Sequence, residues 1–289
     1  MEKILETAYA KINLGLDVLG KRPDGYHEVR MVMQSIGLSD TVELTEGEGL
    51  TVTTGSSELP GGPSNLAWKA AELLARHCGK TPNVHISLNK KIFLAAGLAG
   101  GSSDAAAVLR GLNRLWRLRL NAAELERLAA ELGSDIPFCI TGGTALAEGR
   151  GELLSELPAA PTLQLVLAKP KLEVATAWVY GHFRQEQVQA RPDIDGIIQA
   201  LAQGAVTPLL AGCGNVLESV TIPAHPVIAT IKKRMLAAGA SYALMSGSGP
   251  TVFAVAPSQA IIGQILAALA DLDLLTAVTT TVQKGRILV

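Results

Sequence analysis

Apolar and polar residues alternate or cluster along the first third of the chain in the patterns that are typical of β-strands. The first strand-like stretch ends at Lys21-Arg22-Pro23-Asp24-Gly25, a turn sequence in which Pro presets φ and Gly accepts a positive φ. A helix is predicted over 65–78, with Ser64 as its N-cap and Gly79 just after its end. The strands predicted here span 5–19, 29–36, 41–45, 50–54 and 84–88.

A glycine-rich segment, Gly97–Ser103, follows the last of these strands. It leads into a helix that we expect to begin near Asp104, where three alanines follow in succession. Another helix is predicted after Asn121, because Glu124 stands three residues later and completes a capping box. A strand at 144–148 then closes the first half of the chain.

The second half of the chain has the pattern of a separate unit. Its predicted strands span 163–168, 242–245, 251–256 and 277–283, and its predicted helices span 174–183, 193–202, 227–238 and 259–270. Without the extra helices, this order is β-α-β-β-α-β, the split-βαβ sandwich. The Pro- and Ala-rich piece 157–161 is the expected linker. We therefore predict an α+β fold with two domains, 1–157 and 158–289.

Composition narrows the classes of protein that this chain can belong to. Hydrophobic residues make up 48% of the 289 residues, which excludes an intrinsically disordered chain. The net charge of −1 gives no bulk attraction to nucleic acid or to anionic membranes, and no apolar run reaches the ~18 residues of a membrane helix. The three cysteines form no paired motif and the five histidines no metal-ligand spacing, so we expect a cytoplasmic protein with no protein-built metal site.

The Gly97–Ser103 segment has the chemistry of a phosphate-binding loop. Glycines let backbone N–H groups approach a polyphosphate closely, and a helix N-terminus adds unpaired donors and a partial positive charge. Two serine hydroxyls stand at the same helix mouth. A tight turn with a serine cap is the alternative reading. The segment matches neither the Walker A pattern nor the Rossmann G-x-G-x-x-G.

Three further positions carry candidate chemistry, and each has a structural alternative. Lys11 and Asn13 share one face of an apolar strand, which is also the pattern of an ordinary solvent face. Asp135 precedes Ile136-Pro137 and fits a helix N-cap as well as a reactive carboxylate. The Gly247-Ser248-Gly249-Pro250 turn fits an ordinary hairpin.

In order along the chain, the segment around Lys11, the glycine loop and the segment 246–251 resemble the three signature motifs of the GHMP small-molecule kinases. Within that superfamily, Asp24-Gly25-Tyr26-His27 resembles the turn found in one branch. The enzymes of that branch phosphorylate the 2-hydroxyl of a CDP-linked methylerythritol in the non-mevalonate isoprenoid pathway. The segments 133–138 and 148–152 are also similar to that branch. The resemblance spans nearly the whole chain.

The resemblance implies a two-domain fold whose N-terminal domain is like ribosomal protein S5 domain 2 and whose C-terminal domain is ferredoxin-like. It implies that Lys11 and Asp135 are catalytic, with Asp135 as the base, and that Mg²⁺ is held mainly by the phosphates of ATP near Ser102 or Ser103. The residues that it implies for ATP are Asn65 and Lys90, both near the adenine, and Phe93, Leu94, Ala95, Ala96, Gly97, Leu98, Ala99, Gly100, Gly101, Ser102 and Ser103. Those that it implies for the CDP-linked substrate are Asn13, Tyr26, His27, Thr176 and Tyr180.

The two tyrosines are expected to hold the cytosine between them, with His27 at the edge of the base. The alternative for Tyr180 is the buried stripe of an amphipathic helix, in which case Trp178 is the next candidate. As partners we expect the small-molecule substrate and neither nucleic acid nor membrane, and the chain as a monomer or a weak homodimer.

The chain departs from the family pattern at a few positions. Tyr9 and Phe93 stand where the family usually has Pro, Ala99 interrupts the glycines of the loop, and Asn215-Val216 replaces a usual Asn-Asp pair. Alternative functions are therefore another GHMP kinase, of the homoserine or mevalonate type, and a catalytically silent ligand-binding protein. A nucleic-acid binder on the same folds is disfavoured by the net charge.

Overall fold

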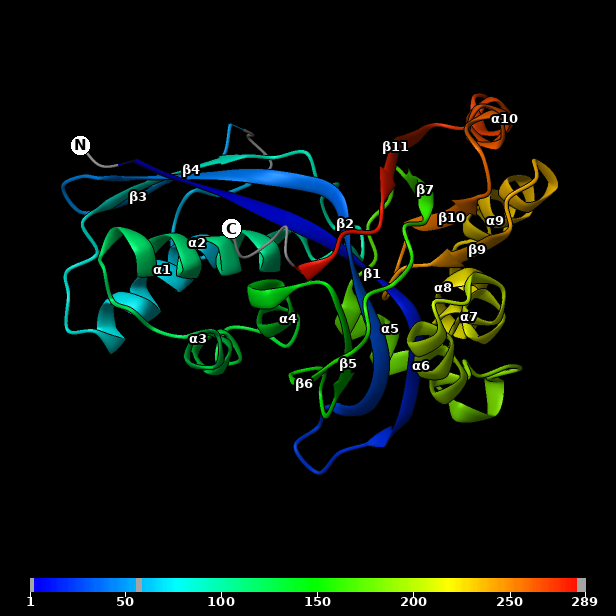
Figure 1. Ribbon diagram of the computed structural model, residues 1–289, viewed down its shortest axis with the longest axis horizontal. Helices are drawn as coiled ribbons and strands as arrows, with labels where there is room; N and C mark the ends of the chain where they lie inside the picture. Colours follow the sequence, from blue (N-terminus) through cyan, green and yellow to red (C-terminus); the bar gives the residue numbers. More distant parts are fainter. Residues whose placement is uncertain (1–2, 56–58, 285–289) are drawn as a thin grey trace.

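The computed structural model describes residues 3–55 and 59–284, and within them the strands form two sheets (Figure 1). Residues 1–2 and 285–289, the ends of the two predicted domains, lie outside the described residues. The larger sheet carries helices α1 (Leu66–His77) to α4 (Ile136–Thr141) on one face, and the smaller sheet lies beside it with α9 (Val227–Ala237) and α10 (Gln259–Leu269).

A long antiparallel hairpin of β1 (Lys3–Lys21) and β2 (His27–Glu46) forms the backbone of the larger sheet. The turn between these strands is the predicted Pro-Asp-Gly turn, where Gly25 takes φ +88°. The pairing register shifts between Tyr9 and Lys11 and again between Asn13 and Gly15. Such irregularities re-aim side chains, and here they flank the segment of β1 that carries Lys11 and Asn13.

The other strands extend this hairpin on both sides. The sheet order is β3-β4-β2-β1-β8, and β5 pairs with β2 and with β6. Alternation predicted β4 correctly: its residues are buried and exposed in strict turn. The bounds are β3 (Leu50–Thr53), β4 (Val84–Asn89), β5 (Thr144–Glu148), β6 (Leu153–Glu156) and β8 (Gly214–Asn215).

Four helices of the first half are α1 (Leu66–His77), α2 (Gly100–Leu115), α3 (Ala122–Ala129) and α4 (Ile136–Thr141). The capping box of Asn121 and Glu124 is confirmed. Two helix starts were predicted wrongly. The N-cap of α1 is Asn65 and not Ser64, and α2 begins at Gly100, four residues before the predicted start near Asp104. Glycines are poor helix formers, so helix propensity alone did not predict the first turn of α2, which begins with Gly100 and Gly101.

The smaller sheet confirms the predicted β-α-β-β-α-β order. It consists of β7 (Gln164–Pro170), β9 (Tyr242–Met245), β10 (Val252–Ala256) and β11 (Leu274–Thr280). These strands pair antiparallel in the order β11-β7-β10-β9, the ferredoxin-like arrangement. The predicted helices α9 (Val227–Ala237) and α10 (Gln259–Leu269) are present, whereas β11 begins three residues before the predicted 277.

Between β7 and β9 lie several short elements, of which the sequence predicted α5 (Thr176–His182) and α6 (Ile194–Gln203). It did not predict η1 (Gln185–Gln187), α7 (Val206–Gly212), β8 or α8 (Glu218–Ala224). The short β8 pairs in parallel with β1 at Gly15 and Leu16, so the second half of the chain contributes to the first sheet. The domain boundary at 157/158 stays a prediction.

One hydrophobic cluster joins the two sheets directly. Ile12 and Ile36 from the hairpin pack with Leu167 and Phe253 from the smaller sheet, and all four are fully buried. This shared core fixes the position of β1 relative to the turn between β9 and β10. Lys11 and Asn13, on either side of Ile12, are therefore held at the junction of the two sheets.

Candidate active site

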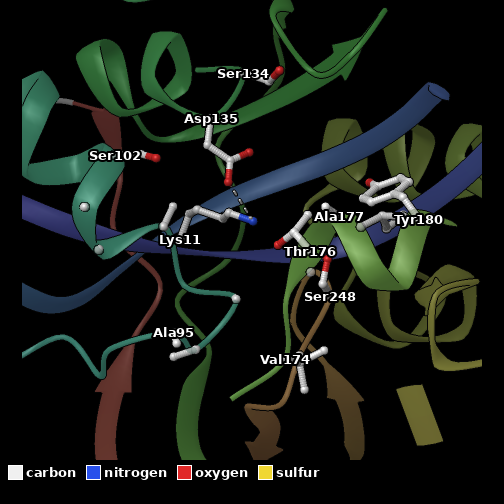
Figure 2. Close-up of a pocket in the computed structure, with 18 of the residues that line it drawn as sticks. Lys11, Ala95, Ser102, Ser134, Asp135, Val174, Thr176, Ala177, Tyr180 and Ser248 are labelled. Carbon is white, nitrogen blue, oxygen red and sulfur yellow. Dashed lines mark ion pairs between the residues drawn. The ribbon is translucent and has the colours of Figure 1, made fainter. Parts of the chain in front are cut away.

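A cavity of about 1050 Å³ lies where the hairpin turn, the glycine loop, the start of α4, helix α5 and the 247–249 turn converge. Its volume is at the upper end of the range for small-molecule sites. All three motifs that the sequence singled out contribute to its wall. Figure 2 shows the centre of this cavity, with side chains from both halves of the chain pointing into it.

Lys11 and Asp135 meet at the centre of the cavity. The Nζ atom of Lys11 lies 3.5 Å from Oδ2 of Asp135, and the two side chains point toward one another in Figure 2. The lysine side chain is only 5% exposed, and its Nζ also donates to Oδ1 of Asn13 at 2.9 Å. The prediction that Lys11 and Asn13 share one face of the strand is confirmed. Asn13 itself is fully buried and orients Lys11 from behind.

Asp135 stands at the N-cap position of α4, but it does not act as a cap. Within the described residues its carboxylate accepts no capping hydrogen bond, and its backbone is helical rather than extended. Pro137 lies in the first turn of the helix, where its missing N–H leaves no donor that needs an acceptor. Asp135 therefore does not serve as a helix N-cap, and its carboxylate faces Lys11.

The glycine loop is locked to both other motifs through its backbone. The carbonyl of Leu98 accepts a hydrogen bond from the N–H of Lys11, and the carbonyl of Gly97 accepts one from the hydroxyl of Ser246. Gly97 has φ +72°, and a Cβ there would overlap the carbonyl oxygen of Ser246. Only glycine satisfies both conditions. The close backbone approach therefore explains this glycine as an interlock between the two halves of the chain.

Most of the predicted ATP-binding residues line the cavity. These are Phe93, Leu94, Ala95, Ala96, Gly97, Ala99, Gly100, Gly101 and Ser102. Leu98 and Ser103 do not, because both side chains are about 1% exposed. The hydroxyl of Ser103 donates to the carbonyl of Tyr9 at 2.7 Å. Of the two serines at the mouth of α2, Ser102 is thus the one whose side chain faces the cavity.

Ala99 immediately precedes α2 and takes φ +57° and ψ +32°, the left-handed region. For a residue with a Cβ this conformation costs about 1–2 kcal/mol. The surrounding contacts must therefore hold the loop in a shape that Ala99 itself disfavours.

Asn65 and Lys90 do not line the cavity. The amide of Asn65 caps α1 through the N–H of Ala67 and donates to the carbonyl of Pro60. The ammonium of Lys90 is buried between Asp40 and Asp104. Their predicted position near the adenine stays a prediction, but both side chains already have protein partners.

Asp104 lies in an unusual electrostatic setting. Burial raises the pKa of this carboxyl to about 7, against the opposing effect of the Lys90 ammonium. Among the described residues, its Oδ1 atom is buried and has no hydrogen-bond partner. Burial also raises the pKa of the Cys139 thiol, beneath the same helix start, to about 12, which disfavours its thiolate.

The predicted substrate residues Tyr26, His27, Thr176 and Tyr180 line the other end of the cavity. The rings of His27 and Tyr180 lie 5.3 Å apart, and burial together with the charge of Lys21 lowers the pKa of His27. Burial also raises the pKa of Tyr180. Tyr26 is 55% exposed. Trp178, the alternative to Tyr180, is not among the lining residues and stacks on His182.

Two cations of the cavity were not singled out as site residues from the sequence. Lys21 and Arg150 both line it, and the guanidinium of Arg150 lies 5.0 Å from the centre of the Tyr26 ring. Glu152 holds Arg150 through its Nε at 3.1 Å and through its backbone N–H. The sequence did contain a signal for Arg150, because the segment 148–152 was part of the family resemblance. The sequence could not show that Arg150 lies close to Tyr26.

In the described residues, no group of three or more His, Cys, Asp or Glu side chains could hold a metal ion. Over the same residues, no helix combines the length and the apolar character needed to cross a membrane. Both results concern residues 3–55 and 59–284 alone.

Comparisons with known proteins agree with this geometry. Residues 65–143 match the GHMP kinases N terminal domain, and residues 190–272 match the GHMP kinases C terminal family. The chain is 49% identical over 270 residues to the 4-diphosphocytidyl-2-C-methyl-D-erythritol kinase of Brevibacillus brevis, with 92% of each chain covered. The chain belongs to this kinase family.

Solved structures support the same assignment. The crystal structure of a 4-(cytidine 5'-diphospho)-2C-methyl-D-erythritol kinase superposes with a TM-score of 0.82 at 35% identity, covering 96% of this chain and 99% of the other. A homoserine kinase from Cytophaga hutchinsonii superposes with a TM-score of 0.73 at 20% identity, covering 96% and 95%. The second match shows a common fold alone. The first confirms the two-domain GHMP kinase fold that the sequence resemblance implied.

Proposed function

We propose that this chain transfers the γ-phosphoryl group of ATP to the 2-hydroxyl of 4-diphosphocytidyl-2-C-methyl-D-erythritol, a step of non-mevalonate isoprenoid precursor biosynthesis. The observation that carries the proposal is the Lys11–Asp135 pair at 3.5 Å. The pair lies between a phosphate-type glycine loop and an end of the same cavity that carries aromatic rings and cations. The family relationship supports the choice of substrate.

In the proposed reaction, Asp135 accepts the proton of the substrate hydroxyl as that oxygen attacks the γ-phosphorus. Lys11 stabilises the negative charge that spreads over the attacking oxygen and the transferring phosphoryl group. Phosphoryl transfer depends mainly on positioning and charge stabilisation, so an ion pair fixed from behind by Asn13 is suited to it. The rigidity of Lys11 follows from its burial.

ATP is proposed to place its phosphates over the start of α2. The backbone N–H groups of Gly100 and Gly101 belong to the first turn of that helix, where N–H groups have no intrahelical partner and favour anions. Leu59, Leu66 and Phe93 form an apolar part of the wall that suits the flat adenine.

Mg²⁺ is proposed to accompany ATP and to be held mainly by its phosphates. The donor set fits this role, since the Ser102 hydroxyl faces the cavity next to the proposed phosphate position while Ser103 is used elsewhere. When bound, the ion neutralises part of the phosphate charge. The protein residues position the triphosphate and supply the proton acceptor.

The CDP moiety is proposed to occupy the opposite end of the cavity. A neutral His27 can donate to or accept from the edge of the cytosine, and the lowered pKa keeps it neutral at pH 7. Tyr180 and Tyr26 offer aromatic faces, and Lys21 and Arg150 offer positive charge for the diphosphate. Arg150 also restrains the ring of Tyr26, which reduces the freedom that binding must remove.

The decisive experiment incubates the protein with ATP, Mg²⁺ and each member of a substrate panel: the CDP-linked methylerythritol, homoserine and mevalonate. ADP release is followed by a coupled assay, and the position of the new phosphate is read by ³¹P NMR. Turnover of the CDP-linked substrate alone, with the phosphate on the 2-hydroxyl, is expected. Preferred turnover of homoserine or mevalonate refutes the substrate, and the absence of any turnover supports the silent binding protein.

The remaining expectations about partners belong to the same proposal. We infer a cytoplasmic enzyme that acts as a monomer or weak homodimer and binds neither nucleic acid nor membrane. The free thiols of Cys78, Cys139 and Cys213 fit a reducing compartment. Sedimentation at enzyme concentrations would test the oligomeric state.

A further inference from the structure

A buried charge cluster lies directly behind the glycine loop. The Nζ atom of Lys90 bridges two carboxylates, those of Asp40 on β2 and Asp104 on α2, with 2.5 Å between Nζ and Oδ2 of Asp104. The side chains of Lys90, Asp40 and Asp104 are 9%, 0% and 4% exposed. Buried charges persist only when they are well paired, so these three side chains hold one another in place.

The cluster is connected to both ends of the loop. Oδ1 of Asp40 accepts hydrogen bonds from the backbone N–H groups of Lys91 at 2.5 Å and Ile92 at 2.8 Å, and the segment after Ile92 leads into the Gly97–Ser103 loop. Asp104 lies in α2, directly after the loop ends at Ser103. Lys90 therefore joins the segment that enters the loop to the helix that leaves it.

Packing also brings the segment before the loop close to the start of α2. A Cβ at Gly100 would lie 3.1 Å from Cγ2 of Ile92, so the segment before the loop lies close to the first turn of α2. Between them stands Ala99 in its disfavoured left-handed conformation. Strain of this kind persists only where the surroundings over-determine the backbone. The hydrogen bonds of Leu98 and Gly97 constrain the middle of the loop, and the charge cluster adds a constraint on the two segments that flank it.

We propose that Lys90, Asp40 and Asp104 are positioning residues that hold the glycine loop in the shape that receives the phosphates of ATP. In this role Lys90 acts through the loop and does not touch the nucleotide. The inference rests on the proposed kinase function, because it assigns the loop to phosphates. It differs from a contact between Lys90 and adenine, which the family resemblance implied, and from a purely structural ion pair.

The test compares Lys90→Met with Asp40→Asn. Met removes the ammonium and keeps an apolar stem of similar length, whereas Asn keeps an oxygen for the two backbone N–H groups and removes the charge that faces Lys90. For each variant we measure KM for ATP, KM for the CDP-linked substrate, kcat and Tm. Inorganic tripolyphosphate serves as a competitive inhibitor that carries phosphates and no base.

Both variants are expected to raise KM for ATP and Ki for tripolyphosphate by the same factor, at least about 10-fold, because small displacements of binding groups have large effects. KM for the CDP-linked substrate should stay at its parent value. Asp104→Asn keeps an oxygen for Lys90, so its KM for ATP should lie closer to that of the parent than to that of Lys90→Met. The matched control is Lys3→Met, which removes an exposed ion pair with Glu43 on the same sheet and should change none of these constants.

Two results would overturn the proposal. If Lys90→Met raises KM for ATP but not Ki for tripolyphosphate, and Asp40→Asn changes neither constant, Lys90 contacts the base directly. If Tm falls in both variants while KM for ATP is unchanged below Tm, the cluster is structural only. Failure of the proposed function is separate, because it would appear as an inactive parent chain, and tripolyphosphate binding measured by calorimetry would still report on the loop.

Discussion

Replacing Asp135 with Asn distinguishes a reactive carboxylate from a helix cap. The substitution keeps the shape of the side chain and removes its ability to accept a proton. Because Asp135 makes no capping hydrogen bond in the described structure, we expect the thermal stability of Asp135→Asn to stay near that of the parent. Activity and stability should therefore separate completely in this variant.

The size of the effect follows from the role and from the ion pair. Loss of a general base lowers kcat by about 10²- to 10⁴-fold. Unit charges at the observed 3.5 Å interact by about 5 kcal/mol at an effective dielectric constant near 20. That energy measures the coupling between the two side chains, so it sets the scale of the non-additivity in the double variant rather than of the loss in kcat. Lys11→Met should fall in the same range, and the double variant should be little worse than the weaker single variant, because the two side chains act as one unit.

The assay measures kcat by coupled ADP release at saturating concentrations of both substrates, and Tm is measured on the same samples. Asp193→Ala is the matched control. Asp193 caps α6 by accepting from the N–H of Gly196, far from the pair. Its loss should cost about 1 kcal/mol of stability, or about 2–4 °C in Tm, with no change in kcat.

Near-normal kcat in Asp135→Asn would refute the assignment of the base. A drop in Tm as large as that of Asp193→Ala would show that the carboxylate stabilises α4 after all. Additive losses in the double variant would show that Lys11 and Asp135 act independently. Each of these results contradicts a different step of the reasoning.

Four further outcomes are expected. Gly97→Ala should abolish ATP binding measured by calorimetry, because its Cβ would overlap the Ser246 carbonyl; a normal Kd would contradict the interlock. Ala99→Gly should leave Kd for ATP unchanged or tighten it, since glycine removes about 1–2 kcal/mol of left-handed strain, and clear weakening would count against this account. Tyr180→Ala should weaken binding of the CDP-linked substrate about 5- to 150-fold, the equivalent of one stacking contact, with Kd for ATP unaffected. Because the pKa of His27 is lowered, KM for that substrate should be flat above about pH 6.5 and rise only below it, and a His27→Asn variant should lack the rise.

Local sequence determined the elements and much of the candidate site. The period-two pattern of β1 placed Lys11 and Asn13 on one face, and the structure joins them by a hydrogen bond. The capping box at Asn121 and the order of strands in the second half were also readable from the chain. These features depend on backbone geometry over a few residues, and this is the range over which sequence patterns carry information.

Tertiary structure decided which polar groups face the cavity. Ser102 and Ser103 are equivalent in sequence, yet one lines the cavity and the other donates to the carbonyl of Tyr9 on β1. Lys90 could not be assigned to a buried cluster, because its partners lie at positions 40 and 104 on other elements. Arg150 became a site residue only when the hairpin turn brought Tyr26 beside it.

The meeting of Lys11 and Asp135 shows the physical reason for this division. The two residues lie 3.5 Å apart although strand β1 and the start of α4 are separated by most of the first domain. Their contact depends on the packing of α2 and α4 against the sheet and on the buried cluster that joins both sheets. Local propensity determines how each segment folds, but only the burial of apolar surface between distant segments determines which polar side chains are left facing one another.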